Sequence, residues 1–490
     1  MTALPELGGD PRRLREALDA AGYDEPGVLA ALGVEVLPEV PGMQRLMLLH
    51  RVRGGSPRET LVRLLLLGEP VSEAAFLAAV APTTVEDWVR AGLMVLDGDT
   101  VRPRARIRPH RGLLIANDPP RVEDDPLRAD FVMGIGSSSI TLAEMTVRRP
   151  SRRTLDLGTG SGIQALLAAP HSDTVIAADR NPRAVAYARF NALLNGLGNV
   201  EGRQGDLFAP VGGERFDLIV SNPPFVISPE RAYLYRDADI EGDALCRRVV
   251  REGAAHLEPG GFCQLLCNFA VPTGGDWREV LGEWCTGTGC DAWAMCAELK
   301  EPEVYATVWI GHTEPPHRHA ELFERWMDHY RRRGITAMGS GVLMLRRATG
   351  GRVPWFHAED AAGRGSGDCG DQILRGFELR DLLERLTDQR ALLSARLRLS
   401  PDARLDQSCT AGTQGWEIER TTVRLTRGLR YQGTIDPHGA LLLGRCTGAQ
   451  PLGDLLAEMS QALGVELESM MPGALEVTRS LIAQGFLVPA

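Results

Sequence analysis

The sequence predicts an α/β fold, in which a largely parallel sheet is covered by helices. Short apolar runs at 153–157, 174–179 and 216–220 have the length and composition of buried strands. Residues 181–198 have the spacing of an amphipathic helix and follow the second of these runs. Strands that alternate with helices are typical of a parallel sheet.

Four further strands are expected in the same region. A short one ends at 205–208, a longer one covers 260–269, and 290–296 and 335–346 are expected to form an antiparallel hairpin pair at the sheet edge. The core is thus expected to contain seven strands.

A glycine-rich turn joins the first expected strand to the next helix. Gly158, Gly160 and Gly162 leave room for a ligand to approach the backbone. The dinucleotide fingerprint requires glycine at the position of Ile163, so the turn favours a nucleoside without a pyrophosphate. Asp179 stands 21 residues after Gly158, a spacing that suits a ribose hydroxyl contact, although a solvated strand end is the alternative.

A second acidic position follows the third expected strand. The Asp206 carboxylate can accept a hydrogen bond from an adenine amino group, and the Leu207 N–H can reach a ring nitrogen. The alternative for Asp206 is a helix N-cap.

The segment Asn222-Pro223-Pro224-Phe225 follows the apolar run 216–220 and carries the most chemical information. A planar amide or amine nitrogen is a poor nucleophile because its lone pair is delocalised. The Asn222 side-chain oxygen and the Pro223 carbonyl can accept both N–H hydrogens of such a group, and Phe225 can lie against its plane. Pro224 cannot compete as a donor because proline has no N–H. A purely structural turn is the alternative.

Taken in order, Asp-Leu-Gly-Thr-Gly-Ser-Gly at 156–162, the acid at 179, Gly-Asp-Leu-Phe at 205–208 and Asn-Pro-Pro-Phe at 222–225 resemble class I S-adenosylmethionine-dependent methyltransferases of the HemK type. The resemblance covers roughly residues 117–350 and implies a Rossmann-like core with S-adenosyl-L-methionine as cofactor. Ser138 or Thr141 is implied to touch the methionine part, with helix capping as the alternative. The cofactor-binding residues that the resemblance implies are Thr141, Gly158, Thr159, Gly160, Gly162, Asp179, Arg180, Asn181, Asp206, Leu207 and Asn222.

The resemblance implies N-methylation and leaves the acceptor open. A protein glutamine, such as that of a release factor, is preferred. An exocyclic amine of an rRNA or tRNA base is the first alternative, because glutamine enzymes usually carry Tyr where this chain has Phe225. A tailoring enzyme for a peptide or small metabolite is the second. A non-catalytic scaffold is disfavoured by the intact motifs.

Flanking regions divide the chain further. Residues 1–115 are predicted to be a helical, winged-helix-like module with a hairpin at Asp97-Gly98. The methyltransferase domain is expected over 116–349, a glycine-rich linker over 350–372 and a second winged-helix-like module over 373–490. The last module is expected to contain helices at 374–397, 452–463 and 475–484, and it faintly resembles peptide-binding domains of the PqqD type.

Composition narrows the class of protein. Hydrophobic residues make up 44% and charged residues 24%, which is typical of a soluble globular protein. No apolar run spans a membrane, no signal pattern opens the chain, and the nine cysteines form no CxxC pair, so a cytoplasmic location is expected. The histidines at 312, 317 and 319 lack metal-ligand spacing, and no metal is assigned.

A net charge of −10 disfavours general coating of nucleic acid. Arg102, Arg104, Arg106 and Arg108 alternate, so on one strand they would share a face and form the best candidate for an RNA contact. Residues 226–243 are charged and aromatic and are predicted to be a substrate-facing loop.

Overall fold

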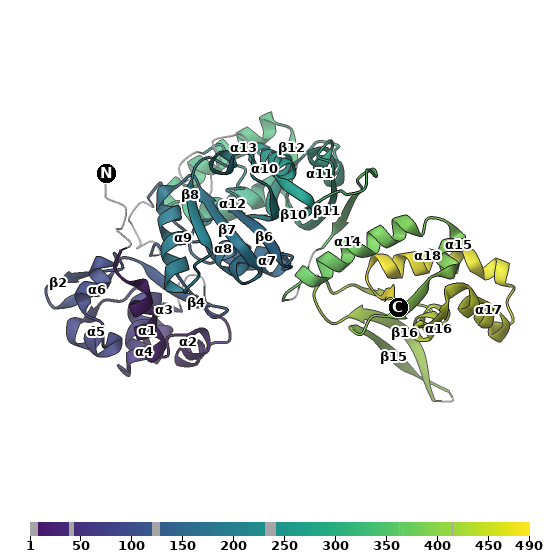
Figure 1. Cartoon of the computed structure of the whole chain (residues 1–490), viewed down its shortest axis with the longest axis horizontal. Coiled ribbons are helices and arrows are strands. Elements are labelled where there is room, and N and C mark those ends of the chain that lie inside the picture. Colours follow the sequence, from purple (N-terminus) through teal and green to yellow (C-terminus); the bar gives the residue numbers. More distant parts are fainter. Residues whose placement is uncertain are drawn as a thin grey trace. The chain divides into compact units, whose positions relative to one another are not determined.

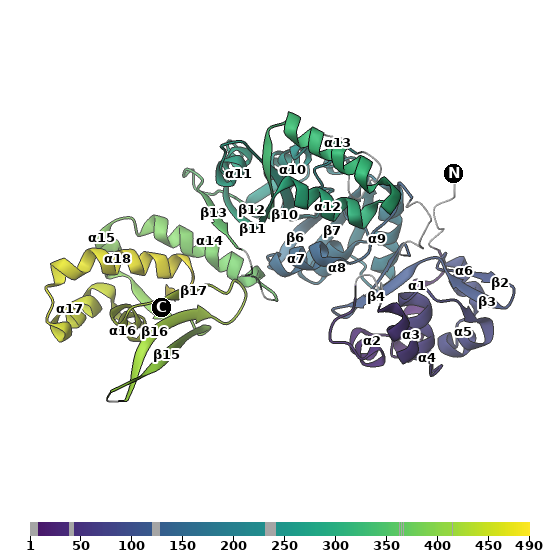
Figure 2. The ribbon, with the colours of Figure 1, turned by 180° about the vertical axis from the view of Figure 1, so that it is seen from behind.

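The computed structural model describes residues 8–38, 44–119, 128–230, 242–361, 363, 365, 367–413 and 415–490. The chain forms two compact units (Figures 1 and 2). The first comprises residues 1–143 and 149–362, and the second comprises 144–148 and 363–490.

An eight-stranded sheet forms the centre of the first unit, in the order β13-β11-β12-β10-β9-β6-β7-β8. Strands β6 to β10 run parallel, and β12 is antiparallel to both of its neighbours. The predicted α/β, Rossmann-like core is confirmed, with one strand more than expected. The bounds are β6 Ser151–Leu157, β7 Ser172–Asp179, β8 Val200–Gln204, β9 Phe216–Ser221, β10 Leu257–Pro272, β11 Cys290–Lys300, β12 Ile335–Arg347 and β13 Phe356–Asp360.

The prediction for the last two strands is half right. Strands β11 and β12 do pair antiparallel, but β12 lies between β10 and β11 and not at the edge. They are joined through two helices, α12 (Pro302–Thr313) and α13 (His319–Arg332), and so form no tight hairpin. The edge belongs to β13, which lies inside the range expected to be a linker and pairs with β11.

Helices cover both faces of this sheet, and β7 shows why. Because successive side chains of a strand point to opposite faces, Ile176 packs into a core with α10 and α11, while Val175 packs into a second core with α8. The helices of this region are α7 Ser137–Met145, α8 Ile163–Ala168, α9 Pro182–Leu194, α10 Ala244–Ala255 and α11 Trp277–Cys285, with short 3-10 turns at Ala169–His171, Ala209–Val211 and Pro316–Arg318.

The N-terminal region is part of the first unit rather than a separate body. Tyr187, Phe190 and Leu194 of α9 are buried in the same core as the N-terminal helices. The elements are α1 Pro11–Ala20, α2 Glu25–Leu32, α3 Arg45–Arg51, α4 Pro57–Leu61, a π-helix Val62–Leu66, β1 Val71–Ser72, α5 Glu73–Val80, α6 Val85–Arg90, β2 Met94–Asp97, β3 Thr100–Pro103, β4 Arg106–His110 and β5 Leu113–Asn117.

The predicted hairpin at Asp97-Gly98 is confirmed, since Asp97 pairs with Thr100 across it. The order helix, strand, two helices, two strands, with the sheet order β1-β3-β2, suits the winged-helix interpretation, which stays a prediction.

Two asparagines of α9 bind the edge of β5 as a neighbouring strand would. Asn191 accepts from the Ala116 N–H and donates to the Ala116 carbonyl, both at 2.8 Å. Asn195, one turn later, makes the same pair of bonds to Leu114, at 2.9 and 2.8 Å. The N-terminal region is therefore fixed to the sheet domain by hydrogen bonds from these two side chains to the β5 backbone, as well as by packing.

The second unit contains two small sheets and five helices among its described residues. Helices are found in the predicted ranges 374–397, 452–463 and 475–484, except that residues 396–399 form a strand. The long hairpin of β15 and β16 was not predicted. The elements are α14 Gly370–Arg385, α15 Gln389–Ser394, β14 Arg396–Leu399, β15 Ala403–Gly412, β16 Gly415–Leu425, β17 Gln432–Thr434, α16 Pro437–Arg445, β18 Thr447–Pro451, α17 Leu452–Leu463, α18 Leu467–Ala483 and β19 Leu487–Pro489.

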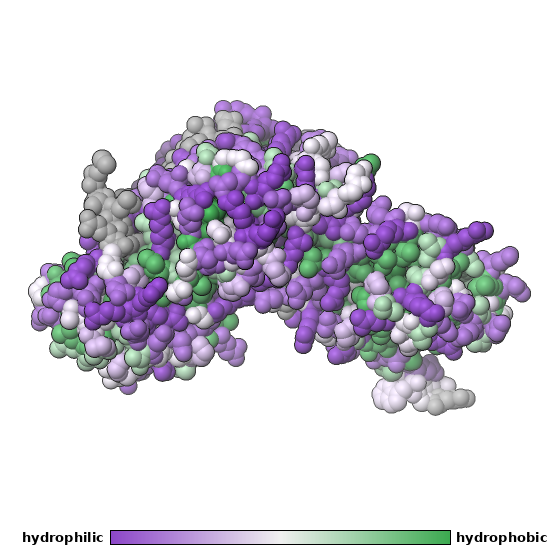
Figure 3. Space-filling view, in the orientation of Figure 1, coloured by the Kyte–Doolittle hydropathy of each residue, from purple (hydrophilic) through white to green (hydrophobic). Residues whose placement is uncertain are grey.

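The surface of each unit carries both hydrophilic and apolar residues. Figure 3 shows a mostly hydrophilic face with scattered apolar patches. No helix among the described residues is long and apolar enough to cross a membrane.

Candidate active site

A cavity of about 570 Å³ lies at the carboxyl ends of β6, β7 and β9, and residues of both sequence motifs line it. The pairing of β6 with β9 places Leu157 opposite Ser221, so the glycine turn and the Asn-Pro-Pro-Phe turn start side by side. A Cβ atom on Gly158 would lie 3.9 Å from the Asn222 carbonyl oxygen. Two motifs about sixty residues apart in the chain thus form one site.

The glycine turn is held by a buried carboxylate. Asp156 Oδ2 accepts the Thr159 hydroxyl at 2.6 Å and the Ala165 N–H of α8 at 2.9 Å. Burial raises the pKa of the Asp156 carboxyl to about 7, although these two hydrogen bonds lower it. Because one oxygen ties the turn to α8, the turn is preorganised for a ligand.

Asp179 ends β7 at the cavity wall. Its carboxylate accepts the Gly160 N–H at 3.0 Å and the Asn181 N–H at 2.8 Å. Burial raises the pKa of Asp179, and the two backbone donors lower it. The predicted ribose-binding carboxylate is therefore fixed in place, with lone pairs left for a ligand.

Asp206 and Leu207 also line the cavity. Leu207 has a φ of 46°, in the left-handed region that a bulky residue rarely adopts, and strain of this kind is concentrated at ligand sites. Asp206 is exposed and pairs at 3.4 Å with Arg248 of α10, which borders the same cavity.

Asn222 has one partnered and one unpartnered side-chain atom. Its Nδ2 donates to the Ser138 hydroxyl at 3.2 Å, which fixes the orientation of the amide. Its Oδ1 is buried and accepts no hydrogen bond. Buried polar atoms in native proteins are nearly always bonded, so an unpartnered acceptor at a cavity wall indicates a ligand donor.

Phe225 lines the cavity beside Trp309 of α12. The two rings meet edge to face, with centroids 6.3 Å apart and planes at 71°. Pro223 and Pro224 line the cavity as well, so the whole predicted Asn-Pro-Pro-Phe set lies at one wall.

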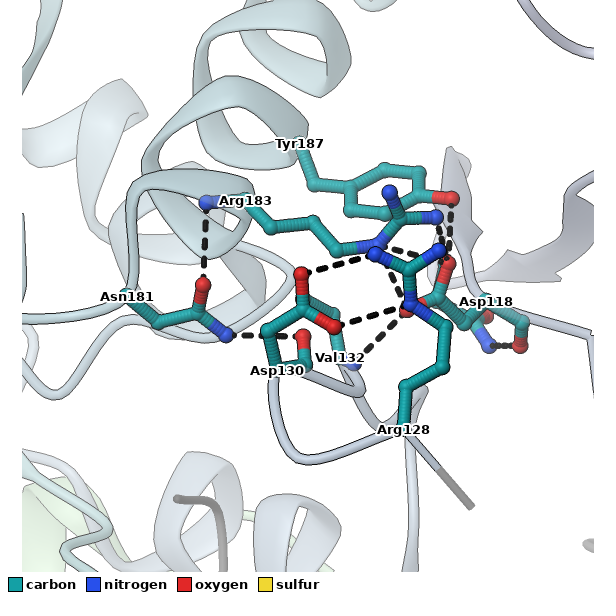
Figure 4. A network of polar contacts seen from close by, with 8 residues as sticks. Asp118, Arg128, Asp130, Val132, Asn181, Arg183 and Tyr187 are labelled. Atoms are coloured by element: carbon teal, nitrogen blue, oxygen red, sulfur yellow. Dashed lines mark hydrogen bonds and ion pairs between the residues drawn. The ribbon is translucent and has the colours of Figure 1, made fainter. Parts of the chain in front are cut away.

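Residues 131–134 cross another part of the cavity wall and are tied to α9 by a polar network (Figure 4). Buried Arg183 forms an ion pair with Asp118, whose carboxylate also accepts the Val132 N–H at 2.8 Å and the Tyr187 hydroxyl at 2.9 Å. Asn181 caps α9 and donates to the Asp130 carbonyl at 2.9 Å. Asn181 therefore joins the cofactor motif to the wall.

The structure separates two predicted residues from the cavity. Thr141 is exposed on α7 and does not line it, because it lies one turn beyond Ser138 and Ser139, which do. Gly162 is needed for packing instead of ligand contact. Its φ is 89°, and a Cβ there would lie 3.0 Å from the Ala188 Cα of α9. Thr159 and Arg180 line the cavity as predicted.

The proposed arginine face does not form. Arg106 and Arg108 are buried in β4 and donate to backbone carbonyls of Pro38 and Leu37, whereas Arg102 and Arg104 are exposed on the other side of the strand break. The prediction is wrong because β3 ends at Pro103, so the alternation does not continue along one strand. In the predicted substrate loop 226–243, residues 231–241 lie outside the described part of the chain.

Sequence reasoning missed several lining residues. Asp156 is the first residue of the glycine-turn motif, but the motif alone did not predict a role for it in the site. The signal that could have found it is a lone acid inside an apolar strand, which indicates a buried hydrogen-bond acceptor. Arg248 and Trp309 had no motif to mark them, since each reaches the cavity from a distant helix.

Three family models match parts of the chain. Residues 134–284 match the family Methyltransferase small domain. Residues 20–104 and 375–489 match two domains of unknown function (DUF7059 and DUF7782).

The chain is 32% identical over 250 residues to the ribosomal protein uL3 glutamine methyltransferase of Bradyrhizobium diazoefficiens, covering 44% of this chain and 75% of the relative. The chain belongs to the class I S-adenosylmethionine-dependent methyltransferases of the HemK type. It is also 39% identical over 142 residues to the release factor glutamine methyltransferase of Xylella fastidiosa, covering 26% of this chain and 51% of that protein. The match thus spans only about half the length of the second relative.

A solved methyltransferase from Pyrococcus furiosus has 19% sequence identity and a TM-score of 0.27, with 43% of this chain and 81% of that chain covered.

S-adenosylmethionine is the methyl donor of this methyltransferase family, and the cavity residues fit it. The carboxylates of Asp179 and Asp206 suit hydroxyl and amino donors. Gly160 has a φ of 55° and open space where a Cβ would stand, so its backbone can be approached closely.

Proposed function

We propose that this methyltransferase acts on the side-chain amide nitrogen of a protein glutamine. The observation that carries the proposal is the buried, unpartnered Asn222 Oδ1 in the wall of the cofactor cavity. Such an oxygen requires a donor that comes from outside the chain, and a primary amide supplies N–H donors on a flat frame.

Asn222 and its neighbours would hold the acceptor as follows. Asn222 Oδ1 and the Pro223 carbonyl accept the two N–H groups, which directs the nitrogen lone pair away from them. Phe225 supports the amide plane. S-adenosylmethionine supplies a methyl group that its positively charged sulfur makes electrophilic. Most of the gain is then positioning, since an amide nitrogen that has gained a methyl group is acidic and needs no strong base.

The relatives support a protein acceptor. One is named for ribosomal protein uL3 and the other for a release factor, and both are named glutamine methyltransferases. An acceptor of this kind supports the expected cytoplasmic location. The alternative of an RNA base loses one of its supports, because the arginines at 106 and 108 are buried, and it keeps the support of Phe225.

The test uses a labelled methyl donor and the full chain. Protein uL3 from Bradyrhizobium diazoefficiens, the release factor from Xylella fastidiosa and a total cell extract serve as acceptors. The expected result is label that protease removes and ribonuclease leaves, and mass spectrometry should place it on a glutamine. Label in RNA or in a small molecule would contradict the proposal.

A further inference from the structure

Helices α12 and α13 form an excursion between β11 and β12, outside residues 134–284 that match the methyltransferase family. The two helices pack side by side (Figure 2). Their apolar residues form a separate core with the residues directly after the Asn-Pro-Pro-Phe turn. The excursion is therefore built onto the acceptor side of the site.

Two tyrosines of this excursion hold one residue of that segment. The Tyr305 hydroxyl accepts the Ile227 N–H at 3.0 Å, and the Tyr330 hydroxyl donates to the Ile227 carbonyl at 2.6 Å. Asn268 of β10 donates to Tyr305 at 2.7 Å and fixes it in turn. The position of α12 relative to Asn222 and Phe225 is thus set by hydrogen bonds.

Trp309 lies one helical turn after Tyr305. Tyr305, Ala306 and Ile310 are buried, with 4%, 0% and 2% exposure, whereas Trp309 is half-buried and borders the cavity. Trp309 packs against this core, as Phe225 does, and its half-buried side chain also borders the cavity. The Trp309 and Phe225 rings meet at 71° and form a corner in the wall of the cavity that Asn222 also lines.

A corner of two aromatic rings selects a flat group. A planar amide stacked on one ring turns its edge toward the other, and both contacts are favourable. A branched or bulky acceptor group would lose one of them. We infer that Trp309 is an acceptor-contacting residue, the second aromatic wall that positions the planar group beside Asn222. The inference rests on the proposed glutamine acceptor for the identity of that group.

The experiment compares Trp309→Ala, Trp309→Leu and Trp309→Phe with the wild type. The control is Val308→Ala, on the same helix, 37% exposed and outside the cavity wall. In the Ala and Leu variants we expect the KM for the acceptor to rise roughly fivefold, since the contact of the planar group with the aromatic ring is lost. The kcat should fall less, Trp309→Phe should recover most of the loss, and Val308→Ala should behave as wild type.

Two further measurements separate positioning from damage. Calorimetry should show an unchanged Kd for S-adenosylhomocysteine, and the Tm of Trp309→Leu should stay close to that of the wild type because an apolar side chain is kept. An unchanged acceptor KM in the folded Leu variant would overturn the inference, and so would an equal loss of affinity for S-adenosylhomocysteine.

Failure of the proposed function gives a different pattern. If the wild type labels no glutamine, that proposal falls. The acceptor KM of the Trp309 variants is then measured with whichever extract fraction accepts the label. If the KM is the same in all variants, the proposed role of Trp309 is overturned independently of the glutamine proposal.

Discussion

The two halves of the cavity are built differently. In the cofactor half, the polar groups bind one another, since Asp156 and Asp179 each accept two hydrogen bonds from the glycine turn or the adjoining helix. In the acceptor half, Asn222 Oδ1 has no partner, and prolines and aromatic rings line the wall around it. The first half is rigid before a ligand arrives, whereas the second is complete only with its acceptor.

Asn222→Ala should give the largest effect, because it removes the unpartnered acceptor. We expect kcat to fall about 100- to 1000-fold, as for removal of one preorganised hydrogen-bonding group, with little change in the Kd of S-adenosylmethionine. Steady-state kinetics and calorimetry measure both. Ser138→Ala is the comparison, since it removes the partner of Nδ2 but keeps the unpartnered oxygen, so its loss of kcat should be smaller. If Asn222→Ala turns over at a rate close to that of the wild type, the acceptor half does not depend on the unpartnered Asn222 oxygen.

Asp156→Asn tests the cofactor half through pH. The folded pKa of Asp156 is about 7, above the ordinary 3.8, so folding favours the protonated form. Its contribution to stability is present below pH 4 and is lost as the pH rises through 7. The variant cannot ionise, so its Tm relative to the wild type should increase between pH 4 and 7.5. A constant Tm difference across this range would show that the carboxyl does not titrate there.

Asn191→Ala tests how the cofactor half is supported. Besides Ala116, Asn191 Nδ2 donates at 2.8 Å to the Ser161 carbonyl in the glycine turn. We expect a loss of about 2 kcal/mol in stability, because buried backbone groups lose their partner, and a several-fold weaker Kd for S-adenosylmethionine.

Asn195→Ala is the matched control for Asn191→Ala. It removes the equivalent bonds to Leu114 without reaching the glycine turn. Thermal unfolding should show a lower Tm in both variants, and calorimetry should show weaker cofactor binding only in Asn191→Ala. Equal Kd values for S-adenosylmethionine in the two variants would contradict a role of Asn191 in supporting the glycine turn.

Gly162→Ala should give the smallest effect on chemistry, because Gly162 lies outside the cavity wall, and Gly160→Ala is its comparison for stability. A methyl at 162 meets Ala188 at 3.0 Å, whereas a methyl at 160 meets nothing within 4 Å. Both carry a positive φ, which costs about 1 kcal/mol, so the extra packing strain should make Gly162→Ala the less stable of the pair by Tm. The reverse order would contradict the packing role of Gly162.

The cofactor half could be predicted because its residues lie in short motifs at the ends of strands, where periodicity and spacing indicate position. The strands around Gly158, Asp179 and Asn222 follow from their apolar runs. Trp309 and Arg248 could not be found this way, since long-range packing alone brings α12 and α10 to the cavity. The arginine face failed for a related reason, as alternation says nothing about where a strand breaks.

Helix α9 has one consequence for how the protein can be divided. It offers Tyr187, Phe190 and Leu194 to the N-terminal core and Ala188 to the core of the sheet domain. A fragment cut just before residue 118 would expose three large apolar side chains and the amides of Asn191 and Asn195 to water. The methyltransferase family model covers residues 134–284, which is shorter than the smallest fragment that we expect to fold. Removing the N-terminal region should therefore yield aggregates and not a minimal enzyme.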